Sequence, residues 1–156
     1  MARLPQSTVN HLGETGARIA MQLRRHEERV TPAKVAVLGA LTRADETPPH
    51  LTARELGAAT AHLGIRLDEA TVYRTLTRLE ALGLVHAVAM NHTTRFGLDT
   101  PPHHHAVCDR CSALQVITAA QLDTLVASAC ALAEFSPGCR QAVTLNGVCG
   151  ACAPPA

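Results

Sequence analysis

Apolar residues recur every three to four positions through the first quarter of the chain, with polar residues between them. Leu12, Ile19 and Leu23 follow this spacing up to about residue 26, while several arginines occupy the other faces. A stripe of this period is the signature of a helix that buries one side. The first stretch therefore predicts an amphipathic helix.

A second helix is indicated by its start signal. Thr31 can act as the N-cap and Pro32 suits the first helical position, where its missing N–H costs nothing. Apolar residues continue to Leu41, and Pro48 and Pro49 stop the helix. We expect this helix to end near residues 45–46.

Two shorter helices follow, each opened by a capping residue. Thr52 and Glu55 form the capping-box pattern of a helix that Gly64 closes. Asp68 can cap the next helix through its side-chain oxygen. The apolar stripe of that helix consists of Val72, Leu76 and Leu79. Together these two helices and the turn between them predict a helix-turn-helix.

The opposite face of the second of these helices has a different chemistry. It carries small, hydroxyl-bearing and guanidinium side chains, namely Ala70, Thr71, Tyr73, Arg74, Thr77 and Arg78. Such groups bind phosphates, pack on thymine methyls and pair with guanine edges in a major groove. The alternative is an arbitrary helical bundle with a solvated arginine face.

Residues 84–88 and 95–98 are apolar-rich and flank a polar turn at 91–92. This pattern predicts a β-hairpin. A hairpin directly after a helix-turn-helix is the wing of a winged helix-turn-helix. Residues 1–98 are therefore expected to form a DNA-binding domain.

The back of the chain has its own pattern, after a linker expected at residues 99–102. Residues 105–108 and 114–118 alternate like strands, 119–133 have helical spacing, and 142–145 resemble a last strand before Asn146 and Gly147. We expect residues 103–156 to form a small α/β domain. The fold class of the whole chain is then α+β.

Two Cys-x-x-Cys pairs lie at opposite ends of this domain, Cys108 with Cys111 and Cys149 with Cys152. Each turn points two sulfurs at one ion, and two turns complete the closed tetrahedral shell of a structural zinc site. The alternative for a single pair is a thioredoxin-like redox dithiol.

Three consecutive histidines, residues 103–105, precede the first cysteine pair. They have no place in a filled four-cysteine shell, so any metal they bind occupies a second, nitrogen-rich site. The alternatives are a solvated loop and a cloning remnant.

Composition supports the division of the chain into a DNA-binding domain and a metal-binding domain. Aromatic residues are only 2% of the chain, so the core depends on aliphatic side chains and a small domain gains from a metal staple. Residues 1–97 contain 12 basic and 9 acidic residues, whereas residues 98–156 contain 2 and 4. A mildly basic front half and an acidic, Cys/His-rich back half fit a polyanion-binding domain followed by a metal-binding one.

No segment approaches the roughly 20 apolar residues that span a bilayer, and the start of the chain has no export signal. We expect a cytoplasmic protein with no membrane partner, where a reducing environment favours thiolate ligands. We do not expect an enzyme, because a zinc deaminase needs a His-x-Glu beside its metal and none accompanies the cysteine pairs. A zinc-ribbon interaction module without DNA binding is the remaining alternative class.

The motifs in order resemble the ferric uptake regulator (Fur) family of bacterial metal-sensing transcription factors. The resemblance runs from about residue 15 to 152 and is carried by Arg29-Val-Thr, His50-Leu-Thr-Ala-Arg-Glu-Leu, Ala70-Thr-Val-Tyr-Arg-Thr-Leu, Leu82-Gly-Leu-Val, His103-x-His-x-x-Cys-x-x-Cys and Cys149-x-x-Cys. It implies a homodimer with an N-terminal winged helix and a C-terminal dimerisation domain. It also implies a regulator that binds palindromic operators when a regulatory metal is loaded.

The resemblance assigns roles to individual residues. Cys108, Cys111, Cys149 and Cys152 match the structural zinc ligands. Tyr73 and Arg74 match recognition-helix contacts, beside Thr71 and Arg78 on the same face, and Arg29 matches a basic residue that approaches the minor groove. His103, His105 and His50 match a regulatory site between the domains.

Two departures bear on which metal is sensed. Iron-type members carry an acidic ligand where this chain has Gly97, and zinc-sensing (Zur) members often carry a ligand where this chain has His86. A set drawn from His86, Asp99, His103 and His105, with His50 in reserve, suits Zn²⁺ or Ni²⁺ better than Mn²⁺. The sequence leaves His50 and His86 as alternatives for the ligand that completes the site. We therefore expect a zinc-responsive repressor; an iron-, manganese-, nickel- or peroxide-responsive regulator is the alternative. A further family site would use His104 and Asp123, although its C-terminal histidine is replaced by Gln141.

Overall fold

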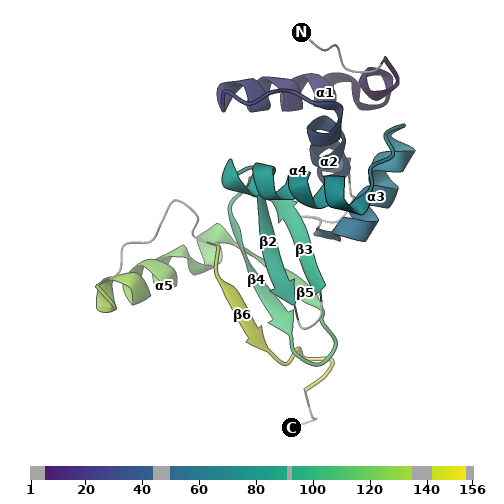
Figure 1. Cartoon of the computed structure of the whole chain (residues 1–156). Helices are drawn as coiled ribbons and strands as arrows, with labels where there is room; N and C mark the ends of the chain where they lie inside the picture. The colour runs from purple at the N-terminus through teal and green to yellow at the C-terminus, as the bar shows by residue number, and fades with distance from the viewer. Residues whose placement is uncertain (1–5, 44–49, 91–92, 135–141, 154–156) are drawn as a thin grey trace. The chain divides into compact units, whose positions relative to one another are not determined.

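The computed structural model describes residues 6–43, 50–90, 93–134 and 142–153. The chain forms two compact units, one made of Met1–Ala87 with Thr94–Leu98 and the other of Val88–Thr93 with Asp99–Ala156. Both contain helices and strands (Figure 1), which confirms the predicted α+β class. None of the helices in the described residues is both long and apolar enough to cross a bilayer.

The first unit is mainly helical. Its elements are α1 (Gln6–Arg25), α2 (Pro32–Arg43), β1 (Leu51–Thr52), α3 (Ala53–His62), α4 (Glu69–Ala81), the start of β2 (Val85–Met90) and nearly all of β3 (Thr93–Leu98). Aliphatic side chains from all four helices build its core, including Leu23, Leu38, Leu41, Leu56, Leu76 and Leu79. The apolar stripes predicted for these helices are the faces that are buried.

Local capping signals set where α3 and α4 begin. The Thr52 hydroxyl accepts a hydrogen bond from the Glu55 amide, and the Glu55 carboxylate accepts one from the Thr52 amide, so the predicted capping box is present. The Asp68 carboxylate accepts from the Thr71 amide. Each cap satisfies backbone donors that the helix itself leaves open. The predicted end of the second helix near residues 45–46 lies outside the described residues.

The wing is a three-stranded sheet in the order β1-β3-β2. Its first strand was not predicted, because two residues carry no readable alternation. Leu51 pairs with Phe96 and Thr52 with Arg95 in antiparallel register. This pairing places His50, the residue before β1, beside the end of β3. The predicted turn at 91–92 lies outside the described residues.

The second unit holds β4 (His103–Cys108), β5 (Leu114–Thr118), α5 (Ala119–Leu132) and β6 (Thr144–Gly147). β4 is central, antiparallel to β5 and parallel to β6. Three strand boundaries differ from expectation. β4 begins at His103 rather than 105, β6 begins at Thr144 rather than 142, and β6 includes Asn146 and Gly147, which the sequence suggested as a turn. Their pairing with Val107 and Cys108 keeps them in the strand.

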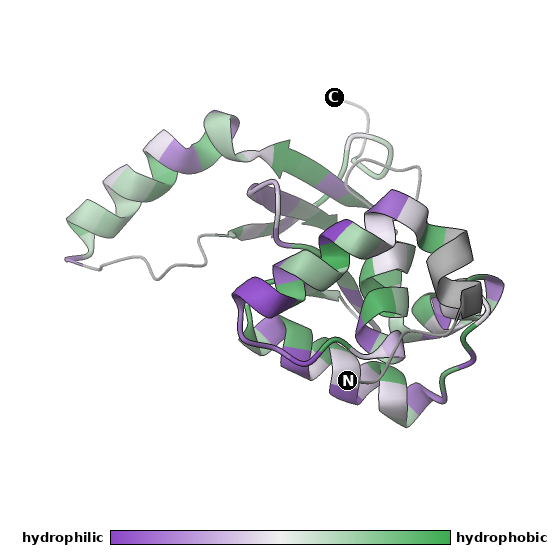
Figure 2. Cartoon of the chain, turned by 90° about the horizontal axis from the view of Figure 1, so that it is seen from above, coloured by the Kyte–Doolittle hydropathy of each residue, from purple (hydrophilic) through white to green (hydrophobic). Residues whose placement is uncertain are grey.

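The helix α5 has hydrophobic residues along its length, as the green positions of Figure 2 show, yet none of its residues is buried in this chain. The predicted apolar stripe is therefore present but uncovered. Leu125 is 65% exposed and Leu132 is 88% exposed. Exposed apolar side chains gathered on one helix are typical of a surface that binds another protein.

Candidate metal centres and nucleic-acid interface

The four motif cysteines gather at one end of the second unit. Cys108 ends β4, and the parallel pairing of β4 with β6 places it opposite Gly147, two residues before Cys149. The Asp109 amide also donates to the Gly147 carbonyl at 2.7 Å. The four Sγ atoms lie within 4.8 Å of one another. The strand pairing therefore joins two turns that are almost 40 residues apart in the sequence.

The spacing of these sulfurs fits a zinc ion. The Sγ atoms of Cys111 and Cys149 are 3.7 Å apart. A tetrahedral ion with Zn–S bonds of about 2.3 Å separates its sulfur ligands by about 3.8 Å. Four thiolates fill such a shell, so the chemistry at this site is structural: the ion would cross-link the ends of β4 and β6 and bring no substrate position.

The acidities of the thiols fit the same interpretation. Amide N–H groups of Cys149 and Cys111 stabilise the Cys108 thiolate and lower its pKa to about 6. The neighbouring thiols of Cys111 and Cys149 raise the pKa of Cys152 to about 12. Packed together without a cation, the four groups cannot all ionise. A divalent cation would remove this conflict by replacing the protons.

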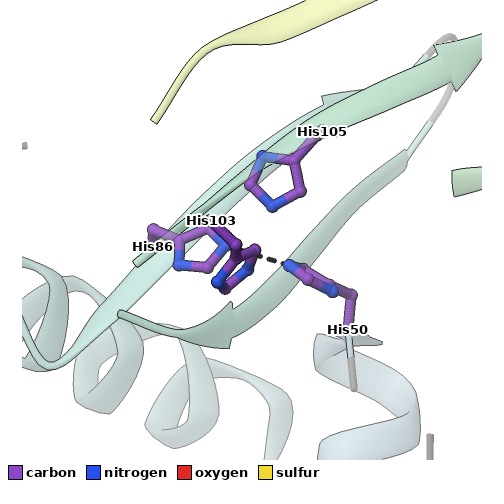
Figure 3. Close-up of side chains that lie close together, drawn as sticks. All are labelled: His50, His86, His103 and His105. Atoms are coloured by element: carbon purple, nitrogen blue, oxygen red, sulfur yellow. Dashed lines mark hydrogen bonds between the residues drawn. The ribbon is translucent and has the colours of Figure 1, made fainter. Parts of the chain in front are cut away.

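A pair of histidines is buried in the first unit. His50 precedes β1 and His86 lies in β2, and their Nε2 atoms face each other at 2.9 Å (Figure 3). The rings meet edge to face, with their centroids 5.1 Å apart. Gly97 of β3 lies against both rings, so close that a Cβ there would be 2.6 Å from the His50 Nε2.

The backbone of His50 is held from β3. Arg95 Nη1 donates to the His50 carbonyl at 2.8 Å, and the same guanidinium lies 3.5 Å from the Glu55 carboxylate. Glu55 in turn completes the α3 capping box. The sequence singled out Glu55 only as a cap and Arg95 only as part of the predicted hairpin. An ion pair across 40 residues has no local signal.

A second pair of histidines is buried in the second unit. His103 and His105 are two residues apart on β4 and therefore point to the same face, with ring centroids 4.9 Å apart. The His103 Nδ1 lies 2.7 Å from the Pro101 carbonyl, which can only accept, so Nδ1 carries the proton. The Nε2 lone pair is then directed away from this bond. In metal sites, the ring nitrogen that does not bind the metal commonly donates a hydrogen bond to such a carbonyl.

His104 points to the opposite face of β4. Its Nδ1 accepts from the Val143 amide and its Nε2 donates to the Asp123 carboxylate, each at 3.1 Å. Both ring nitrogens are thus engaged by the protein. Within the residues that the structure describes, no third metal-ligating side chain joins His104 and Asp123, and Gln141 lies outside them. Asp99, half-buried after β3, belongs to neither histidine pair.

The exposed face of α4 carries the predicted DNA contacts. Tyr73 is 47% exposed, and its ring rests edge to face against Phe96 of β3. Arg74 is exposed and its guanidinium donates to the Thr71 hydroxyl at 2.9 Å. That bond orients the guanidinium along the helix face. The face is therefore a preformed polar surface of hydroxyl and guanidinium groups.

Arg78 differs from the other predicted contacts because it has a partner within the unit. Its Nε donates to the Glu28 carboxylate at 2.7 Å, and Lys34 binds the other oxygen at 2.6 Å. Lys34 and Arg78 together lower the pKa of Glu28 to about 2. Sequence reasoning missed Glu28, which lies 50 positions from Arg78. Arg29, next to Glu28, is exposed as expected for a DNA contact.

The chain matches the ferric uptake regulator family over residues 25–137. It belongs to this family. The Fur-family chain is similar to the peroxide-responsive repressor PerR of Staphylococcus epidermidis, with 26% identity across 83% of this chain and 85% of the relative. It is also similar to the ferric uptake regulator of Pseudomonas aeruginosa solved with manganese, with 25% identity, a TM-score of 0.70, and coverage of 85% and 98% of the two chains.

A zinc uptake regulator solved with zinc and DNA has the same fold, with 24% identity, a TM-score of 0.59, and coverage of 89% of this chain and 93% of the other. Family membership, with the histidine and cysteine clusters, makes this Fur-family chain a metal-responsive DNA-binding transcriptional regulator. It is not an enzyme.

Proposed function

We propose that the chain is a zinc-responsive repressor that binds a palindromic DNA operator as a homodimer. The observation that supports this proposal is the set of possible metal ligands, which consists of two buried histidine pairs. Gly97 lies against His50 and His86, at the position where iron-type members of the family carry an acidic ligand. Imidazole nitrogens suit Zn²⁺, whereas Mn²⁺ prefers oxygen ligands. The proposal places this chain in the zinc-sensing branch of the family.

The regulatory ion would be shared by the two pairs in this proposal. Two nitrogens alone bind an ion weakly, but His50 and His86 together with His103 and His105 supply a full tetrahedral set. The pairs belong to different units of the chain. An ion bound by both would therefore favour one arrangement of the units over others, and DNA binding would follow by population shift. Asp99 is available as a replacement ligand in this proposal.

Zinc would also occupy the cysteine site, but in a different role. The four thiolates form a closed shell whose ion is part of the fold, whereas the histidine site uses neutral ligands that exchange metal more readily. One chain would then take up two zinc ions of very different affinity. This difference allows one ion to be sensed while the other stays bound.

DNA would be read by the exposed face of α4. Thr71, Tyr73 and Arg74 would contact bases and phosphates in the major groove, and Arg29 would reach the neighbouring backbone or minor groove. Arg78 would add to the phosphate contacts with its exposed edge while it stays bound to Glu28. In a two-fold dimer, the two α4 helices would meet half-sites about 34 Å apart.

The partner in the dimer would cover α5 and the edge strand β6. The side chains of β6 are exposed, and Leu145 on this strand is 47% accessible. A second copy offers the same apolar surface, so a two-fold contact buries it on both chains. The second unit alone, with few buried apolar residues, would gain much of its stability from this contact.

The deciding experiment is operator binding measured by fluorescence anisotropy at fixed salt, titrated with Zn²⁺, Fe²⁺, Mn²⁺ and Ni²⁺. We expect Zn²⁺ to activate binding at the lowest free concentration. The alternatives have specific support from the manganese-bound relative and from the PerR sequences. Activation by Mn²⁺ or Fe²⁺ that hydrogen peroxide abolishes would replace the zinc assignment with a peroxide-responsive one.

Histidine variants test the site itself. Since the structure pairs His50 with His86, we expect His50→Ala and His86→Ala each to abolish metal-activated operator binding while one zinc per chain remains in the cysteine site. His62→Ala, which removes an exposed histidine of α3, serves as the matched control and should bind as the wild type does. Normal zinc activation of His86→Ala would contradict the proposed site.

A further inference from the structure

Gly97 stands in the interior of β3, where glycine is a poor choice. It loses more backbone entropy on folding than other residues and packs no side chain, so it stabilises a strand less than alanine does. Its backbone does not require glycine either: the glycines with positive φ in the described residues are Gly13, Gly64 and Gly83. The reason for glycine here must therefore lie in the space around its Cα.

That space is filled by the histidine pair. A Cβ on residue 97 would lie 2.6 Å from the Nε2 and 2.7 Å from the Cδ2 of His50, and 3.0 Å from the Cε1 of His86. The first two distances are shorter than real Cβ contacts. Both rings are buried and held to each other at 2.9 Å. An alanine would thus have to push at least the His50 ring away from its place.

The His50 ring has little freedom to move aside. Its backbone is tied to β3 by the Arg95 guanidinium at 2.8 Å, and the next residue, Leu51, is paired with Phe96. The displacement would therefore fall on the side-chain torsions of His50 and on the contact with His86. The contact between the two Nε2 atoms is the one that would be lost.

We propose that Gly97 is a positioning residue for the histidine pair, and that the space left by its missing side chain lets both Nε2 atoms reach a single ion. Tetrahedral zinc with bonds of 2.0–2.1 Å separates two ligand nitrogens by about 3.4 Å. The pair has to open by about half an ångström from its present 2.9 Å to take up the ion. A Cβ at residue 97 occupies part of the volume in which the rings adjust.

This inference rests on the proposed zinc function, and it concerns the affinity and ligand geometry of that same site. With glycine, the first unit contributes two nitrogens. With any larger residue it contributes one, and the affinity for an ion that needs both falls. Gly97 would in this way determine that the site takes a nitrogen-rich, four-coordinate ion.

The first test is zinc affinity measured by competition with a chromophoric chelator on full-length Gly97→Ala. We expect the weaker of the two zinc sites to lose about 10- to 100-fold in affinity, while the cysteine zinc stays bound. Gly57→Ala on α3 is the matched control, because a Cβ there meets only ordinary contact, with its nearest neighbour at 4.0 Å. Wild-type affinity in Gly97→Ala would overturn the proposal.

The second test needs no regulatory metal and keeps the two proposals distinguishable. Thermal unfolding of His50→Ala, Gly97→Ala and the double variant forms a cycle. We expect Gly97→Ala to lower the midpoint in the wild-type background and to have a much smaller effect once the His50 ring is gone. Equal losses in both backgrounds would refute the positioning role. If wild type binds no second zinc but the cycle shows coupling, the zinc function fails and the steric inference stands.

Discussion

At the scale of single residues, the two kinds of donor in this chain have opposite needs. The cysteines carry protons that a metal must displace, and their pKa values diverge because one thiolate is stabilised by amide N–H groups while its neighbours repel further charge. The histidines coordinate as neutral ligands, and the carbonyl of Pro101 holds the proton of His103 on Nδ1. The ligand types alone therefore distinguish the cysteine site, whose ion stabilises the fold, from the histidine site, whose ion can exchange.

The cysteine site leads to a prediction at this scale. Cys108→Ser should release the tightly bound zinc and unfold the second unit, because apparent zinc affinity of about 10–16 kcal/mol in such sites is largely folding energy. Zinc per chain, measured by atomic emission, and amide exchange in β4 and β6 are the readouts. Cys130→Ser is the control, since Cys130 lies outside the cluster. A well-folded, zinc-free Cys108→Ser protein would contradict the structural role.

At the scale of elements, the strand β3 connects several functions of the first unit. Phe96 supports Tyr73 on α4, Arg95 holds the His50 carbonyl, and Gly97 makes room for the histidine rings. Two arginines on the exposed face of α4 have different partners: Arg74 binds Thr71 of its own helix, whereas Arg78 binds Glu28. The two arginines should therefore respond differently to substitution.

Arg74→Ala should weaken operator binding by about 1–3 kcal/mol if the guanidinium contacts a base. It should leave zinc content and thermal stability unchanged. Arg78→Ala should in addition lower the thermal midpoint, because it removes one of the two cations that stabilise the Glu28 carboxylate. Arg18→Ala on α1 carries the same change of charge on another exposed surface. Operator affinity of Arg74→Ala equal to that of Arg18→Ala would show that this face is only solvated.

At the scale of the whole molecule, the second unit leaves its helix uncovered. None of the residues of α5 is buried, and its exposed leucines lie on one side of the helix. A helix of this composition is stable in water when another surface buries its apolar side. The proposed homodimer supplies that surface, and it also sets the spacing of the two α4 helices on an operator.

Leu125→Glu should therefore shift the protein from dimer to monomer, because the dimer interface would have to bury an unpaired carboxylate. Sedimentation equilibrium over a range of concentrations measures the change, and operator binding should weaken with it. Ala127→Glu adds the same charge about 160° away around the helix, at 100° per residue, and should leave the dimer intact. A dimer of unchanged strength in Leu125→Glu would place the interface elsewhere.

Short-range signals account for what the sequence alone determined. The caps at Thr52 and Asp68 act within one helical turn, and each cysteine pair acts within four residues. Their meaning does not depend on the rest of the fold, so the helix starts, the two-part organisation and the cysteine cluster were all predictable. Even where a boundary was wrong, as in β6, only one or two residues were affected.

Only the tertiary structure decided which distant groups meet. His50 and His86 are 36 positions apart and Glu28 and Arg78 are 50 apart, and no periodicity links them. The sequence left His50 and His86 as alternatives, whereas the fold makes them partners because the short strand β1 pairs with β3. The pairing of β1 with β3 also places His50 against Gly97. The sequence showed Gly97 only as the absence of a carboxylate ligand, whereas the structure shows that its missing side chain leaves room for the two rings. Such contacts depend on strand register, and register is set by the packing of the whole unit.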